Sequence, residues 1–183
     1  MSKFVITISP LLTALLIAPG ISYSASNAQM TITSNVVAST CDVSVSNTNL
    51  DLGNFNKSAF QAVGVAKPIT SSIKNFTVGL SNCETPTAGG VARLKVTGQT
   101  LAGNSNIFNS TGTNTGIMLN LKDQANVYIN AGDKLDIATA GDTPTSGDFN
   151  GKTLSLQAGL ASSSTTPDIG EINAPVLFSF IYN

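Results

Sequence analysis

The sequence has no histidine and no tryptophan, and only 10% of its 183 residues are charged. Without histidine there is no His general base, no Ser-His-Asp or Cys-His nucleophile pair, and no His-ligated zinc or haem. Nine Lys and Arg residues stand against ten Asp and Glu, so the chain lacks the basic excess that binding to a phosphate backbone requires. These absences exclude the most common enzyme sites and argue against a nucleic-acid partner.

The few acidic residues do not indicate a catalytic or metal-binding site. The only concentration of carboxylates lies in Gly-rich segments typical of solvated turns, and it comprises Asp133, Asp136, Asp142 and Asp148. A calcium site or an acid-base pair at these positions is the minor alternative. Two cysteines without histidine and without CxxC spacing provide too few ligands for zinc. We expect no enzymatic activity, no metal and no cofactor.

Hydroxyl and amide side chains dominate the polar part of the chain, with 21 Ser, 21 Thr and 18 Asn residues. This composition is poor in helix formers and suits short strands joined by many turns. Apolar residues alternate with polar ones in successive segments, as half-buried strands require. We expect strands within residues 30–41, 41–45, 50–52, 76–83, 92–96, 117–121, 127–129, 154–160 and 172–182.

Turn residues separate these segments. Gly89-Gly90 predicts a turn, and Asn150-Gly151 is the strongest hairpin signal in the sequence because both residues tolerate positive φ. The polar segments from Ala102 to Gly116 and from Thr139 to Gly147 are expected to be loops. No helical period separates the strands, so we expect an all-β chain folded as one β-sandwich domain.

The first 28 residues have the order of a secretory signal peptide. Lys3 precedes an apolar stretch that Pro19 breaks, and a cluster of small residues follows. The apolar stretch is too short and too interrupted for a membrane span, although a retained anchor helix is the alternative. We expect cleavage between Ser24 and Ala28, at a bond that the sequence does not decide. Export then leaves residues 29–183 as a single domain.

Both cysteines lie in this exported part. An even number of cysteines in an exported chain favours one disulfide, here between Cys41 and Cys83. A cross-link that closes a loop of this length stabilises a fold by about 4 kcal/mol in the loop-entropy description.

The final segment is unusually apolar for a strand that ends a chain. One of its faces carries Ile172, Ala174, Val176, Phe178, Phe180 and Tyr182. Pro175 lacks the N–H group for a ladder, so it is expected at an edge, a strand start or a bulge. An edge strand with aromatic side chains promotes association unless something covers it. Closure of an ordinary core and association with a partner both remain open from this pattern.

Several motifs, in order, resemble one family. They are Ala38-Ser39-Thr40-Cys41-Asp42-Val43, Leu50-Asp51-Leu52-Gly53, Phe76-Thr77-Val78-Gly79-Leu80-Ser81-Asn82-Cys83, Gly170 and the penultimate Tyr182. Together, behind a signal peptide, they resemble the subunits of chaperone-usher pili of Gram-negative bacteria, in the branch typified by type 1 fimbriae. The match covers nearly all of the exported chain.

The resemblance implies an incomplete immunoglobulin-like β-sandwich that is completed by a donor strand. A periplasmic chaperone would fill the groove first, the outer-membrane usher would act next, and a neighbouring subunit would fill the groove last. The implied groove residues are Gly170, Val176, Phe178, Phe180, Tyr182 and Asn183, whose carboxylate would meet basic chaperone residues. The implied function is a structural subunit of a cell-surface fimbria that contributes to adhesion.

Two further features bear on this interpretation. A first strand near Met30 would leave only a few residues after the cleavage site, whereas subunits of this family carry a donor extension there. The alternative function is a minor or tip-associated adhesin that binds host carbohydrate or protein through surface loops such as that from Ala102 to Gly116. The absence of Trp and the lack of length for a lectin domain do not favour that alternative.

Overall fold

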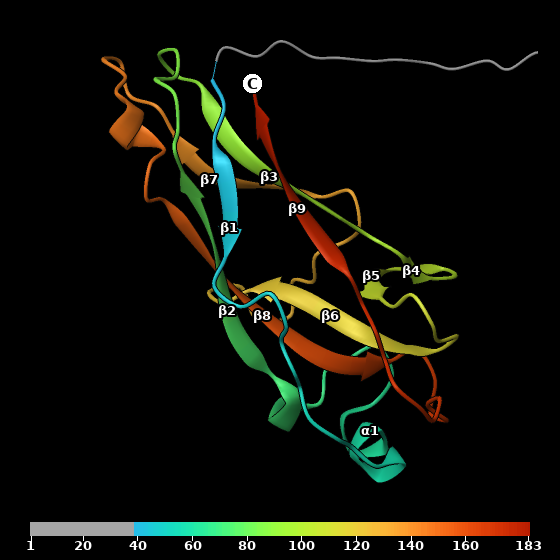
Figure 1. Cartoon of the computed structure of the whole chain (residues 1–183). Coiled ribbons are helices and arrows are strands. Elements are labelled where there is room, and N and C mark those ends of the chain that lie inside the picture. The colour runs from blue at the N-terminus through green and yellow to red at the C-terminus, as the bar shows by residue number, and fades with distance from the viewer. Residues whose placement is uncertain (1–38) are drawn as a thin grey trace, which may run out of the picture. The chain divides into compact units, whose positions relative to one another are not determined.

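The computed structural model describes residues 39–183, which form two antiparallel sheets of a β-sandwich (Figure 1). The larger sheet has the strand order β1-β2-β8-β6-β5-β4, and the smaller one has the order β7-β3-β9. The strands of the larger sheet are β1 (Asp42–Val45), β2 (Lys74–Ser81), β4 (Thr100–Leu101), β5 (Asn104–Phe108), β6 (Thr115–Leu121) and β8 (Thr153–Ser162). Those of the smaller sheet are β3 (Val91–Gly98), β7 (Lys134–Thr139) and β9 (Val176–Tyr182).

The sequence alternation produces one buried face on each sheet. On β2, Phe76, Val78 and Leu80 are buried, and Phe76 lies opposite the fully buried Leu156 of β8. On β3, Ala92 and Leu94 are completely buried, while Arg93 between them points outward. These inward faces meet in one core, which holds the sandwich together.

Most of the predicted strands are present, and the predicted disulfide joins Cys41 to Cys83. Pro175 immediately precedes β9, which is an edge strand, as expected of a residue without an N–H group. The strand predicted from Met30 lies largely outside the described residues, as does the signal peptide.

Three strand predictions were wrong. Residues 50–52 lie in an irregular segment between β1 and the helix that follows it, although Leu50 and Leu52 still pack against the core. The other two errors concern a strand concealed by its polar composition and a turn mistaken for a strand. β5 lies inside the segment predicted to be a loop, and its adjacent Ile107 and Phe108 are both fully buried. They enter different apolar clusters on opposite faces of the sheet. Residues 127–129 do not form a strand, because Val127 is exposed and only a single bridge joins Tyr128 to Asn120.

The sandwich also has features that the sequence interpretation did not contain. The alternating segment of β7 was not predicted, and Asn150-Gly151 forms a turn between the two sheets rather than a hairpin. The short helix α1 (Lys57–Val63) follows β1, with the Asn56 side chain accepting a hydrogen bond from the Ala59 N–H at its start. Two 3-10 turns occupy Thr70–Ser72 and Ser146–Asp148.

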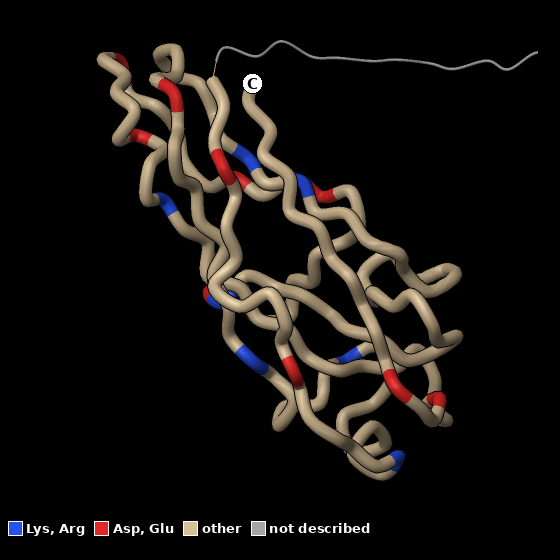
Figure 2. The backbone as a smooth tube through the Cα atoms, in the orientation of Figure 1, with Lys and Arg blue, Asp and Glu red and all other residues tan. Residues whose placement is uncertain are grey.

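The charged residues of the described chain are dispersed rather than gathered in patches of one sign (Figure 2). None of the helices in residues 39–183 is long and apolar enough to cross a membrane.

Candidate binding groove between two edge strands

Two edge strands, one from each sheet, lie side by side on one face of the sandwich (Figure 1). β1 pairs with β2 on one side, and β9 pairs with β3 on one side. Over residues 39–183, no strand ladder joins β1 to β9. Each strand therefore presents an edge whose backbone N–H and C=O groups have no ladder partner in the described sandwich.

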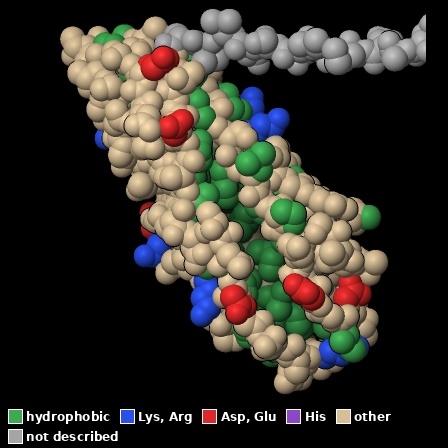
Figure 3. Space-filling view, in the orientation of Figure 1, with side chains coloured by type: hydrophobic (Ala, Val, Ile, Leu, Met, Phe, Trp, Pro, Cys, Tyr) green, Lys and Arg blue, Asp and Glu red, His purple; other side chains and the backbone are tan. Residues whose placement is uncertain are grey.

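Half-buried apolar side chains from both strands pack against the common core and line the space between them. They come from β1 and the residues on either side of it, and from β9 and the segment before it: Cys41, Val43, Val45, Leu50, Leu52, Ala174, Val176, Phe180 and Tyr182. Figure 3 shows a recessed band of apolar side chains between polar ridges on this face. We call the space lined by these residues the β1–β9 groove.

The predicted apolar stripe of β9 faces this groove. The side chains of Val176, Phe180 and Tyr182 are half-buried, whereas Phe178 is only 8% exposed. Phe178 packs against Phe76 with ring centroids 6.0 Å apart, so it belongs to the floor of the groove. The other three side chains retain open surface along its β9 wall.

The end of β9 is held by specific contacts. The Tyr182 hydroxyl accepts a hydrogen bond from the Thr87 N–H at 2.8 Å and forms another with the Thr87 hydroxyl at 2.5 Å. Gly90 leaves room for this ring, since a Cβ atom there would overlap the Tyr182 hydroxyl. Asn183 is exposed, and its backbone oxygen accepts a hydrogen bond from the Val91 N–H at 2.9 Å.

Gly170, the remaining predicted groove residue, lies six positions before β9 in an exposed bend with a φ of +135°. It borders a hollow of about 240 Å³ that Asn109 and Ile172 also line. Ile172 packs near the helix α1 in a third apolar cluster, so the apolar stripe continues beyond the N-terminal end of β9.

The segment before Gly170 is fixed by Asp168. One oxygen of its carboxylate accepts hydrogen bonds from the N–H groups of Thr113 and Asn114, each at 2.8 Å. Hydrogen bonds from the Asn114 and Thr113 backbones hold the pKa of Asp168 below its usual range, because they stabilise the ionised form. Asp168 thereby ties the connection that precedes β9 to the loop that precedes β6.

The sequence profile of the family described as Fimbrial protein matches residues 27–183 of the chain. The chain belongs to the fimbrial protein family. Among solved structures, it is similar to the P pilus rod subunit PapA, with a TM-score of 0.53 and 22% identity over 85% of this chain and 99% of that one. A subunit in the structure of a chaperone-usher pilus has a TM-score of 0.49 and 20% identity, over 91% of this chain and 100% of that one. No curated protein matches the sequence.

This fimbrial subunit therefore has the immunoglobulin-like sandwich fold of a pilin. The described part of the subunit contains no group of three or more His, Cys, Asp and Glu side chains arranged to hold a metal ion. Its distinctive feature is the β1–β9 groove, which is an apolar surface beside two open strand edges.

Sequence reasoning assigned the groove to β9 alone and missed the opposite wall. That wall is formed by β1 and by Leu50 and Leu52, which contact the same core. The alternation of Cys41, Val43 and Val45 was recognised as a strand, but the sequence could not show that this strand lies across from β9 in the other sheet.

Proposed function

We propose that this fimbrial subunit polymerises by accepting a β-strand of another polypeptide in the β1–β9 groove. The observation that carries the proposal is the combination of two open strand edges with one apolar band between them. Strand addition uses both features, because backbone hydrogen bonds supply affinity and alternate side chains entering an apolar surface supply register. An inserted strand would cover the half-buried core residues and remove the exposed edges.

The supply of strands follows the order that the resemblance to type 1 fimbriae implies. A periplasmic chaperone fills the groove first, and a neighbouring subunit replaces it at the outer-membrane usher. The residues that meet the inserted strand are Gly170, Val176, Phe178, Phe180, Tyr182 and Asn183. Removal of the signal peptide delivers residues 29–183 as one pilin domain to the cell-surface fimbria, where the polymer contributes to adhesion.

The exported chain has a suitable donor segment of its own. The first described strand begins at Asp42, so cleavage after residue 28 leaves 13 residues (29–41) ahead of it. No charged residue lies between Lys3 and Asp42. Within this stretch, apolar residues occupy the even-numbered positions Met30, Ile32 and Val36, with polar residues between them. A segment that is uncharged and alternately apolar suits an apolar groove, because a buried charge without a partner is costly. We infer that the segment from 29 to 38 enters the groove of a second copy.

A labelled peptide of residues 29–40 tests this proposal by fluorescence anisotropy with the purified mature chain. We expect saturable binding that a Phe180→Asp variant of the chain loses, because the new carboxylate enters an apolar surface. A peptide with Ile32→Asp serves as the matched control and should not bind. A mature chain that stays monomeric, melts cooperatively and ignores the peptide would refute the proposal.

A further inference from the structure

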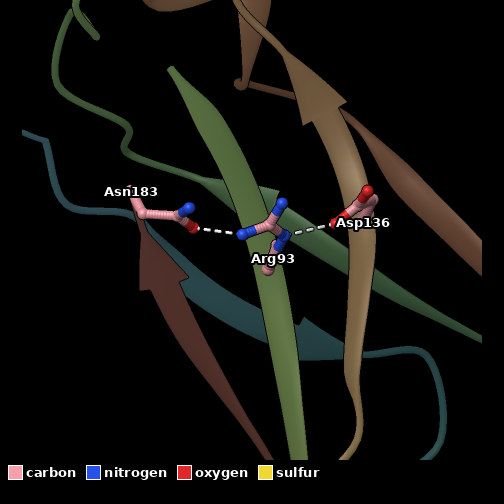
Figure 4. A network of polar contacts seen from close by, with 3 residues as sticks. All are labelled: Arg93, Asp136 and Asn183. Carbon is pink, nitrogen blue, oxygen red and sulfur yellow. Dashed lines mark hydrogen bonds and ion pairs between the residues drawn. The ribbon is translucent and has the colours of Figure 1, made fainter.

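Arg93 is the only arginine in the chain, and it connects the final residue to the middle of the smaller sheet (Figure 4). Its Nη1 donates a hydrogen bond to the side-chain Oδ1 of Asn183, and its Nε donates to Oδ1 of Asp136, each at 2.5 Å. The guanidinium lies on the outer face of β3 and reaches toward both neighbouring strands, β7 and β9.

A bulge in β7 brings the acidic partner into position. Ala92 of β3 lies opposite Ala138, but the next residue, Arg93, lies opposite Asp136, so Ile137 is the extra residue. Bulges of this kind redirect side chains and are common in edge strands such as β7. Here the bulge places the Asp136 carboxylate beside the guanidinium, which is then oriented for its second acceptor on Asn183.

The contact matters because it acts on the last residue paired between β3 and β9. Terminal residues of an edge strand fray unless something ties them down. Asn183 exchanges two backbone hydrogen bonds with Val91, of 2.9 and 3.3 Å, and these form the last pair between β3 and β9. The Arg93 contact adds a side-chain restraint on the residue that makes this last pair.

We propose that Arg93 is a positioning residue that keeps the C-terminal end of β9 ordered while the β1–β9 groove is empty. The inference rests on the proposed function, since the ordered end is the edge that an incoming strand would meet. Preorganising that edge lowers the entropy that binding must overcome. A lysine cannot replace Arg93, because an ammonium lacks the planar fork that reaches two acceptors on opposite sides.

The ion pair is too exposed to explain Arg93 through global stability. The side chains of Arg93 and Asp136 are 27% and 67% exposed, and pairs at such positions contribute little to folding. The expected effect is therefore local, and hydrogen exchange measured residue by residue can detect it.

Hydrogen exchange of the mature chain, followed by NMR, tests the proposal without any partner. In Arg93→Ala and in Arg93→Lys, the amides of Val91 and Asn183 should exchange roughly three- to tenfold faster, as expected for loss of an exposed hydrogen bond to a charged group. Amides in the centre of β8 should keep their rates. Lys95→Ala is the matched control, since Lys95 lies exposed two positions along on β3, and its rates should equal those of the native chain.

Three results would overturn the role assigned to Arg93: unchanged exchange in Arg93→Ala, full protection in Arg93→Lys, or an equal acceleration throughout the domain. The peptide of residues 29–40 provides a second readout, and its affinity should fall roughly three- to tenfold in Arg93→Ala. An unchanged affinity would also count against the proposal. If the native chain does not bind the peptide, the proposed function fails, while the exchange rates still decide whether Arg93 orders the chain end.

Discussion

Phe178 and Phe180 lie on the same face of β9, but their truncation to alanine should have different consequences. Phe178 is buried against Phe76 in the floor of the β1–β9 groove, whereas Phe180 is half-buried in its wall. We predict that Phe178→Ala mainly lowers the stability of the subunit itself. We predict that Phe180→Ala mainly lowers its affinity for an inserted strand.

The magnitudes follow from burial. Truncating a buried Phe to Ala costs about 3–5 kcal/mol, a large share of the roughly 5–15 kcal/mol that stabilises an ordinary domain. A Phe side chain buries about 150–250 Å² when fully covered. If an inserted strand covers a quarter of the surface of Phe180, about 50 Å² are newly buried. At about 25–30 cal/mol per Å², this contributes about 1.3–1.5 kcal/mol, or roughly tenfold in affinity.

Urea denaturation and peptide binding together separate the two effects. Phe178→Ala should shift the unfolding midpoint strongly, and Phe180→Ala should shift it little while weakening binding of the peptide of residues 29–40 by roughly tenfold. Leu177→Ala is the control, because Leu177 is 62% exposed on the opposite face of β9. Equal unfolding midpoints for Phe178→Ala and the native chain, or unchanged peptide binding by Phe180→Ala, would refute this division of roles.

Three further predictions concern single contacts. Asp168→Asn should destabilise the subunit near neutral pH by only about 1 kcal/mol or less, because water screens this partly exposed carboxylate. The stabilisation by Asp168 should fade as pH falls below about 3.9, because its pKa is lowered on folding, and urea titrations at several pH values test both expectations. Reduction of the Cys41–Cys83 disulfide should cost about 4 kcal/mol, and alkylation of the unreduced protein should leave its intact mass unchanged. Gly90→Ala should displace the Tyr182 ring and lower the melting temperature, whereas Gly89→Ala, with no atom near its Cβ position, should be strained only by its positive φ.

The strands that bury one face were predictable because apolar side chains recur at every second residue along them. Phe76, Val78 and Leu80 alternate in the sequence and all point into the core, so period two is visible without a structure. The alternation in β9 was equally clear, and the residues of its apolar stripe pack against the same core.

The missed elements depend on information that is not local. Ile107 and Phe108 are adjacent and both buried, because each face of the sheet is covered at that point, so β5 shows no alternation. The helix α1 has local signals, Asn56 before it and Gly64 after it, but seven residues are too few for a visible helical period. The far wall of the groove could not be predicted, since the topology of the two sheets decides which strand lies across from β9.

The disulfide has a particular consequence for an open groove. β1 has only four residues and a ladder partner on one side, so strand pairing alone holds it weakly. The Cys41–Cys83 bond fixes its start, and nearby Glu84 donates its N–H to the Thr40 carbonyl while its own carbonyl accepts a hydrogen bond from the Ser39 hydroxyl. These links hold one wall of the groove from its first residue, and the Arg93 contact restrains the final residue of the other wall. The start of β1 and the last residue of the β9 wall are therefore both held in place. Without a partner strand, these ends would otherwise separate from their sheets.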